Sequence, residues 1–254
     1  MCTDVQRTIV LENGDTLHGL IIPLSSARFL VQTSELCLDL SETEIQSVDG
    51  ESDLRRILGP PREELNRTNY LHEVNEDGSE TVWEQSVEVH KGPGMKEYLT
   101  FVFQADRELS EEERRELSEV VDSLEYRDGF GKLLPISGKE EMETGWKYTI
   151  TFDVPVAPGE AIELITKKVW PRWARKEGDE WVRRHYIGHT EGTLTTVTIK
   201  LPKGAQCTHV EPEPLRKMTF NGQEIIVWRR YIAKKEAFRP VVRYRLDDHQ
   251  GEVD

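Results

Sequence analysis

The stretch from Trp146 to Thr166, WKYTITFDVPVAPGEAIELIT, constrains the fold most, because it holds two alternating apolar runs. Every second side chain from Trp146 to Phe152 is aromatic or aliphatic, and alternate residues of a strand share one face. Pro158-Gly159 between the runs is typical of a tight turn. The pattern predicts a β-hairpin, and similar runs on both sides place it in the middle of a β-sandwich.

The remaining chain predicts about eleven to thirteen strands and one helix, without the strand–helix alternation of α/β proteins. The helix is predicted near residues 110–122. Ser110 and Glu113 form a capping-box pattern at its start, and Leu117 and Val121 lie on one helical stripe. The fold class is therefore all-β with one helix. We expect a small N-terminal β-barrel followed by a larger antiparallel β-sandwich, immunoglobulin-like in general architecture.

Residues 7–49 contain five short strand patterns joined by turn residues, which favours a small barrel. The run LENGDTLHG and the later LDLSETEIQSVDG resemble Sm-like and SH3-like small β-barrels. The resemblance implies a sharp bend of the second strand at Gly19. Sm proteins carry an acidic residue and an Asn in the third strand, where they contact RNA. The segment SSARFLVQTSE lacks that pair, so the resemblance implies no RNA contact by residues 25–35. The expected division is a barrel over 1–50, a linker over 51–68, a sandwich over 69–248 and a polar tail over 249–254.

Charge is distributed unevenly along the chain. The net charge is −14, yet residues 166–254 carry 18 basic and 12 acidic side chains, a net charge of +6. The acidic bulk disfavours indiscriminate nucleic-acid binding, while the basic end can form a local anion-binding face or meet acidic surface elsewhere in the protein. Three dispersed cysteines fit a reducing compartment. With no signal-peptide pattern and no membrane-length apolar run, we expect a cytoplasmic protein without a transmembrane segment.

The basic end contains tryptophan and arginine side chains in close succession. This combination is enriched in protein interfaces, binds phosphates and stacks on bases, lies at lipid headgroups, or forms cation–π contacts within a sheet. A purely structural cation–π cluster is the plain alternative to an interface. The candidate interaction residues are Trp170, Arg172, Trp173, Arg175, Trp181, Arg183, Arg184, Trp228 and Arg230, with Arg229 beside the last two.

The sequence contains no linear catalytic motif, such as a nucleophile elbow, a phosphate-binding loop or a Cys–His pair. His185 and His189 have metal-ligand spacing for a helix, but on a strand they lie about 13 Å apart. Cys207 and His209 are further potential ligands, and ordinary surface histidines are the simpler interpretation. We therefore expect neither a metal nor another cofactor. Carboxylate runs such as Glu140-Glu141 and Glu111-Glu112-Glu113 are interpreted as solvated charge.

Together these patterns predict a non-catalytic binding or regulatory module. The aromatic and basic face would hold a protein partner or another copy of the chain. Nucleic-acid or anion binding by the same face is the alternative. An enzyme whose site is built from loops, and therefore leaves no linear motif, is the second alternative.

Overall fold

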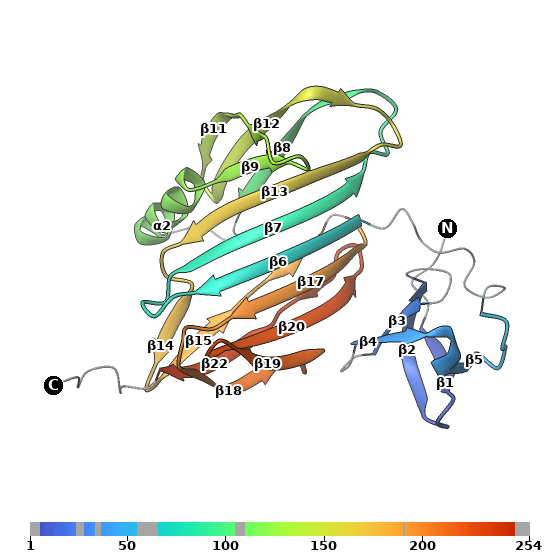
Figure 1. The fold of residues 1–254 in the computed structure, drawn as a ribbon. Helices are drawn as coiled ribbons and strands as arrows, with labels where there is room; N and C mark the ends of the chain where they lie inside the picture. Colours follow the sequence, from blue (N-terminus) through green and yellow to red (C-terminus); the bar gives the residue numbers. More distant parts are fainter. Residues whose placement is uncertain are drawn as a thin grey trace.

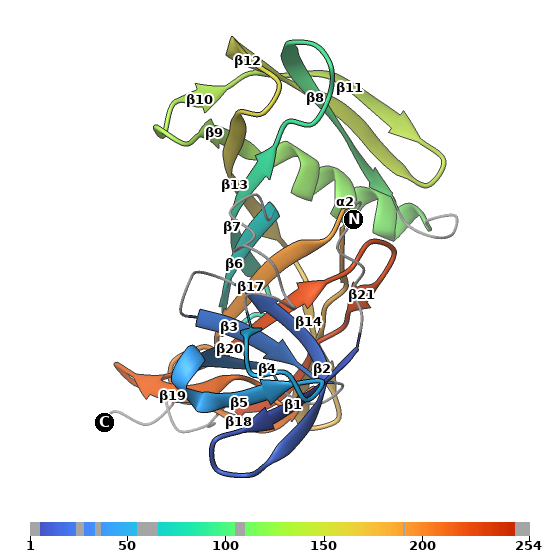
Figure 2. The ribbon, with the colours of Figure 1, turned by 90° about the vertical axis from the view of Figure 1, so that its right-hand side faces the viewer.

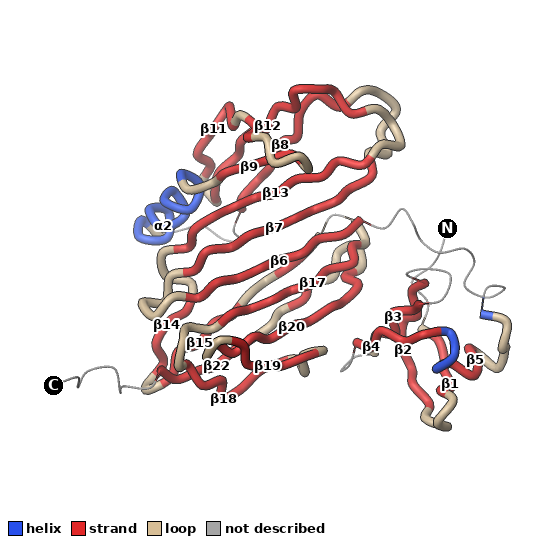
Figure 3. The backbone as a smooth tube through the Cα atoms, in the orientation of Figure 1, coloured by secondary structure: helices blue, strands red, loops and turns tan. Residues whose placement is uncertain are grey.

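The computed structural model describes residues 6–23, 28–33, 37–54, 66–104, 110–189 and 191–246, and β-strands dominate it (Figure 3). The predicted all-β class is confirmed. Among the described residues one α-helix is seen in full, α2 (Glu111–Asp122). It begins after Ser110, where the structure forms the predicted capping box. In the described ranges no helix is long and apolar enough to cross a membrane.

The N-terminal unit is one five-stranded sheet in the order β4-β3-β2-β1-β5. Buried Ile9, Phe29 and Val31 form its core together with Leu54. The order places β4 and β5 at opposite edges, so the described strands form an open sheet and the predicted closed barrel is not seen. Its elements are β1 (Arg7–Leu11), β2 (Thr16–Pro23), β3 (Arg28–Gln32), β4 (Cys37–Ser41), the short 3-10 helix η1 (Glu42–Glu44) and β5 (Ile45–Val48).

Strand β2 changes partners at Gly19, the position at which the resemblance implies a sharp bend. Residues up to Gly19 pair with β1, and residues from Leu20 pair with β3. A Cβ atom on Gly19 would clash with the backbone oxygen of Gln32, so this close approach of the two strands requires glycine. Most of the predicted linker lies outside the described residues, and β6 already begins at Asn66.

An eight-stranded sheet forms the body of the protein, in the order β10-β9-β13-β7-β6-β17-β20-β19 (Figure 1). Its neighbouring strands are antiparallel except β6 and β17, which run parallel. The strands are β6 (Asn66–Val74), β7 (Glu80–Val89), β9 (Glu125–Asp128), β10 (Leu133–Leu134), β13 (Ala161–Trp170), β17 (Thr193–Lys200), β19 (Arg216–Phe220) and β20 (Gln223–Ile232).

Two smaller layers cover different halves of one face of this sheet. A three-stranded sheet and α2 cover the half around β13, and a four-stranded sheet covers the half around β17 and β20, each over its own core. The first consists of β8 (Lys96–Gln104), β11 (Ile136–Met142) and β12 (Gly145–Val156). The second consists of β14 (Ala174–Glu177), β15 (Glu180–Arg184), β18 (Ala205–Glu211) and β22 (Val241–Leu246), beside the short pair β16 (Ile187–Gly188) and β21 (Ala237–Phe238).

The segment 146–166 is not the hairpin that its pattern predicts. Strand β12 pairs with β8 and β11, whereas β13 pairs with β7 and β9. The chain therefore crosses from one layer to the other at the turn. Tyr148 and Ile150 on β12 face Ile162 and Leu164 on β13 within one core. Burial of apolar side chains, not backbone pairing, joins the two strands.

The N-terminal unit lies against the start of β17 and the end of β20 (Figure 2). Leu20 and Leu30 pack on Leu194 and Tyr231 there. Gln32 fixes the contact, because its Nε2 donates to the Tyr231 oxygen at 2.8 Å and its Oε1 accepts from the Tyr231 amide at 2.6 Å. A buried amide that uses both of its groups positions two units specifically.

Candidate functional site

The structure does not bring all of the predicted interaction residues to one surface. Trp228 is 1% exposed, and its Nε1 donates to the oxygen of Pro212 at 2.8 Å. Arg183 is fully buried. These two side chains belong to the interior, so their prediction as interaction residues is wrong. The error arises because the alternation of residues along a strand does not show which face of the strand a second sheet covers.

Arg183 on β15 forms an ion pair with Glu80 on β7. Its Nε lies 2.8 Å from Glu80 Oε2, and its NH2 lies 3.0 Å from Oε1. His72 Nδ1 contacts both the carboxylate and the guanidinium. Burial raises the pKa of Glu80, but the Arg183 charge and the hydrogen bonds outweigh it and hold that pKa at about 2. The pair therefore stays ionised and joins the large sheet to its four-stranded cover.

Two histidines complete this interior cluster. The rings of His72 and His185 lie 4.8 Å apart, edge to face. Burial, with the Arg183 charge, lowers the pKa of His72 to about 4 and lowers the pKa of His185 well below its ordinary value. Both rings are neutral at neutral pH. Trp173 packs on His185 with 5.1 Å between the ring centres, and Trp170 packs on Trp173 with 4.0 Å between the ring centres.

Arg184 and Arg230 also have partners within the protein. Arg184 NH1 lies 2.6 Å from Glu177 Oε1. Arg230 NH2 donates to the oxygen of Thr33 at 3.2 Å, and its guanidinium lies 5.5 Å from the Phe238 ring centre. The plain structural alternative therefore fits much of the predicted group.

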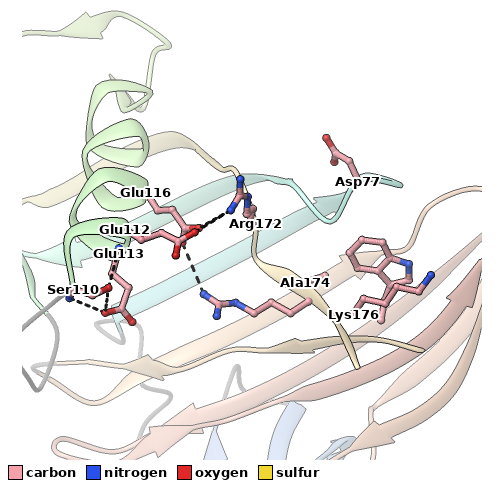
Figure 4. Close-up of a pocket in the computed structure, with 10 residues that line it drawn as sticks. Asp77, Ser110, Glu112, Glu113, Glu116, Arg172, Ala174 and Lys176 are labelled. Atoms are coloured by element: carbon pink, nitrogen blue, oxygen red, sulfur yellow. Dashed lines mark hydrogen bonds and ion pairs between the residues drawn. The ribbon is translucent and has the colours of Figure 1, made fainter. Parts of the chain in front are cut away.

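Three predicted residues, Arg172, Arg175 and Trp181, line one open pocket of about 500 Å³ (Figure 4). It lies between the N-terminal end of α2 and strand β14. The other lining residues are Asp77, Ser110, Glu112, Glu113, Glu116, Ala174 and Lys176.

The helix side of the pocket is acidic and already contacts two of the arginines. Glu112 and Glu116 are one helical turn apart and therefore share a face. Arg172 NH1 lies 3.2 Å from Glu112 and 3.8 Å from Glu116, and Arg175 NH2 lies 3.9 Å from Glu116. Figure 4 shows Arg172 and the two glutamates pointing toward one another. Acidic residues are favourable here because the N-terminal end of a helix is positive.

The strand side of the pocket is held by the β14–β15 hairpin. Lys176 lies opposite Trp181 in the register, and the Trp181 ring stacks on Tyr244 at 6.4 Å. The turn before β7 approaches closely, because a Cβ atom on Gly78 would lie 2.6 Å from both the Trp181 ring and the Ala174 oxygen. The hairpin thus presents Arg175 and Lys176 at the pocket, and Arg175 has 69% of its side chain exposed.

The acidic side of the pocket was missed from the sequence. Glu112 and Glu113 were interpreted as solvated charge, and Glu116 and Asp77 were not singled out. The i, i+4 spacing of Glu112 and Glu116 marks them as one acidic helix face. What the sequence lacks is the contact between residue 112 and residue 172, which are 60 positions apart.

The four residues suggested as metal ligands make other contacts or lie on a different strand. His189 Nε2 lies 2.9 Å from Thr195 Oγ1, and His185 packs on His72. Cys207 and His209 lie on β18, which pairs with β22. Within the described ranges no group of three or more His, Cys, Asp or Glu side chains is placed to hold a metal ion.

Comparison with known proteins gives no family for this chain. No family model and no curated protein matches it. Among solved structures, it is similar to an M1 zinc metallopeptidase from Deinococcus radiodurans, with 11% identity and a TM-score of 0.42 over 70% of this chain and 41% of that one. A mutant of that enzyme gives 9% identity and a TM-score of 0.41 over 69% and 41%. The chain spans about two fifths of these structures. A likeness this weak carries no argument about function.

Proposed function

We propose that the protein is a non-catalytic binding module whose pocket between α2 and β14 receives a segment of a partner protein. The supporting observation is that exposed Arg172 and Arg175 line one concave site of about 500 Å³ together with Trp181. Arginine and tryptophan in a concave site are the residue types that dominate protein-interface energetics.

The charges of the pocket favour a polypeptide over a nucleic acid. Its lining has three basic side chains, Arg172, Arg175 and Lys176, and four acidic ones. Phosphates at such a site would face carboxylates at short range, whereas nucleic-acid sites are strongly positive. A polypeptide segment can carry an acidic side chain for the basic residues and a basic one for the carboxylates.

The ion pairs within the pocket can exchange partners at small cost. The side chains of Arg172 and Glu112 are 62% and 64% exposed, and solvent-exposed pairs contribute little to stability. A ligand carboxylate can therefore replace Glu112 at Arg172. Trp181 is already held against Tyr244, so binding orders few further groups.

The double variant Arg175→Glu/Lys176→Glu tests this function. Some proteins should co-purify with the wild type after nuclease treatment. We expect their amounts to fall about tenfold or more in this variant, as measured by quantitative mass spectrometry. The matched control is Lys91→Glu/Lys234→Glu. It makes the same charge change at the opposite end of the sheet, where β7 ends and β17 begins. The control should retain the partners.

Identical protein profiles for the wild type and both variants would sink the proposal. Once a partner is purified, calorimetry should give the same ranking of affinities. Binding that disappears on nuclease treatment would instead point to the nucleic-acid alternative.

A further inference from the structure

Strand β19 forms one edge of the eight-stranded sheet and is unusually open. All five of its residues, Arg216 to Phe220, are exposed. Phe220 is 64% exposed, with Met218 at 37% and Leu215 at 39%. Its register with β20 has no shift. A regular edge strand with apolar side chains is a template for pairing with another strand.

Several other edge strands among the described residues are protected in recognised ways. The pairings of β5, β11 and β18 contain register shifts. Strand β10 has only two residues. Such shifts and short strands discourage pairing between sheet edges. Strand β19 lacks shifts and proline, and Pro214 precedes it.

We propose that β19 pairs antiparallel with β19 of a second copy of this chain, joining two large sheets across a two-fold axis at Met218. In this register Met218 lies opposite Met218, Arg216 opposite Phe220 and Lys217 opposite Thr219. No like charges face each other, and each arginine meets an aromatic ring. The contact is isologous, because each copy offers the same strand.

Local charge permits a second copy at this edge. Residues 202–226 carry three basic and three acidic side chains, although the whole chain has a net charge of −14. Lys217 is held by Glu224 at 3.1 Å on the neighbouring strand. Two copies therefore meet here without net repulsion, whereas residues 67–165, with 10 basic and 23 acidic side chains, would repel their own kind.

Cysteine cross-linking tests the register. With Cys2, Cys37 and Cys207 replaced by serine, Met218→Cys should form a disulfide-linked dimer under mild oxidation. The two Met218 Cα atoms would lie about 4.5–5.5 Å apart, within disulfide range. Arg216→Cys alone should not cross-link, because it faces Phe220. A mixture of Arg216→Cys and Phe220→Cys chains should cross-link.

Light scattering gives an independent measure. The wild type should show a mass rising with concentration toward twice 29.4 kDa. Met218→Lys, which places two lysines opposite each other, should weaken association at least tenfold. Met95→Lys, at another exposed methionine, should behave like the wild type. A monomer mass at all concentrations, or equal cross-linking of each single cysteine, would overturn the proposal. The pocket is a separate surface, so either proposal can fail alone.

Discussion

Loss of the Arg183 side chain should destabilise the protein strongly, because this side chain is fully buried and ion-paired. Arg183→Met leaves the fully buried Glu80 carboxylate without its main partner. Removing one member of a buried pair typically costs about 3–5 kcal/mol. We expect a loss of that size in the free energy of unfolding, measured by urea denaturation.

The neighbouring residue is the matched control. Arg184→Met breaks an exposed pair with Glu177 and should change the unfolding free energy far less. The double variant Arg183→Met/Glu80→Gln should recover part of the loss, because it also removes the unpaired charge. Equal effects of Arg183→Met and Arg184→Met would contradict a buried ion pair.

His72 should make stability depend on pH below neutrality. Its pKa is about 4 in the folded protein and about 6.5 in an unfolded chain. Between these values the unfolded state binds more protons, so stability falls as pH falls from 6.5 to 4. His185 acts in the same direction. Glu80 makes stability depend on pH in a lower range, because its pKa falls from 4.5 to about 2 on folding.

Urea denaturation between pH 7.5 and 4.5 measures this dependence. In His72→Gln the slope should decrease by up to about 1.4 kcal/mol per pH unit, the value for one proton. An unchanged slope in His72→Gln would show that His72 binds protons equally in both states.

The residue types in the sequence identified a set of aromatic and basic side chains, but they did not show which of these side chains are buried and which are exposed. Arg183 and Arg184 are adjacent on β15, and strand alternation places them on opposite faces. One is buried against Glu80 and the other is exposed beside Glu177. Without knowing which face the large sheet covers, the sequence cannot separate an interior arginine from a surface one. Arg172 and Arg175 line the pocket between α2 and β14, and the sequence predicted these residues without the pocket.

Turns that are determined by a short local sequence could be predicted. Asn221 and Gly222 both have positive φ values, as the Asn-Gly pair requires in the hairpin of β19 and β20. The turn at Pro158-Gly159 was equally recognisable, but it joins strands of two layers. Which strands pair depends on long-range packing.

Helix α2 offers a test of such a local signal. In the capping box the Ser110 side chain accepts from the Glu113 amide, and the Ser110 amide donates to Glu113 Oε2 at 2.9 Å. Ser110→Ala should lower the unfolding free energy by about 1 kcal/mol. Ser137→Ala, on exposed β11, is the control. The loss of the cap should also show as faster exchange of the Glu113 amide in the first helical turn, because this amide donates to the Ser110 side chain. Unchanged exchange there would mean that contacts with Arg172 hold the helix end without the cap.

The whole molecule depends on one junction that the sequence did not reveal. The pattern predicted separate N-terminal and C-terminal units, yet Gln32 and Tyr231, 199 positions apart, share two hydrogen bonds. Amphipathic patterns mark which faces are apolar but not which face of another unit covers them. Leu20 and Leu30 therefore look like ordinary core residues in the sequence, although they pack on Leu194.

Gln32→Ala should loosen this junction while leaving both units folded. It removes a buried amide and leaves the Tyr231 backbone without two hydrogen bonds, which costs about 1–3 kcal/mol. We expect faster amide exchange at residues 28–32 and 230–233, and earlier proteolytic cleavage between the units. Gln85→Ala, which removes an exposed glutamine contact with Glu163, should exchange like the wild type. If exchange rises throughout the N-terminal sheet rather than at the junction, Gln32 stabilises that unit itself. If nothing changes, packing of Leu20 and Leu30 on Tyr231 is sufficient to hold the two units together.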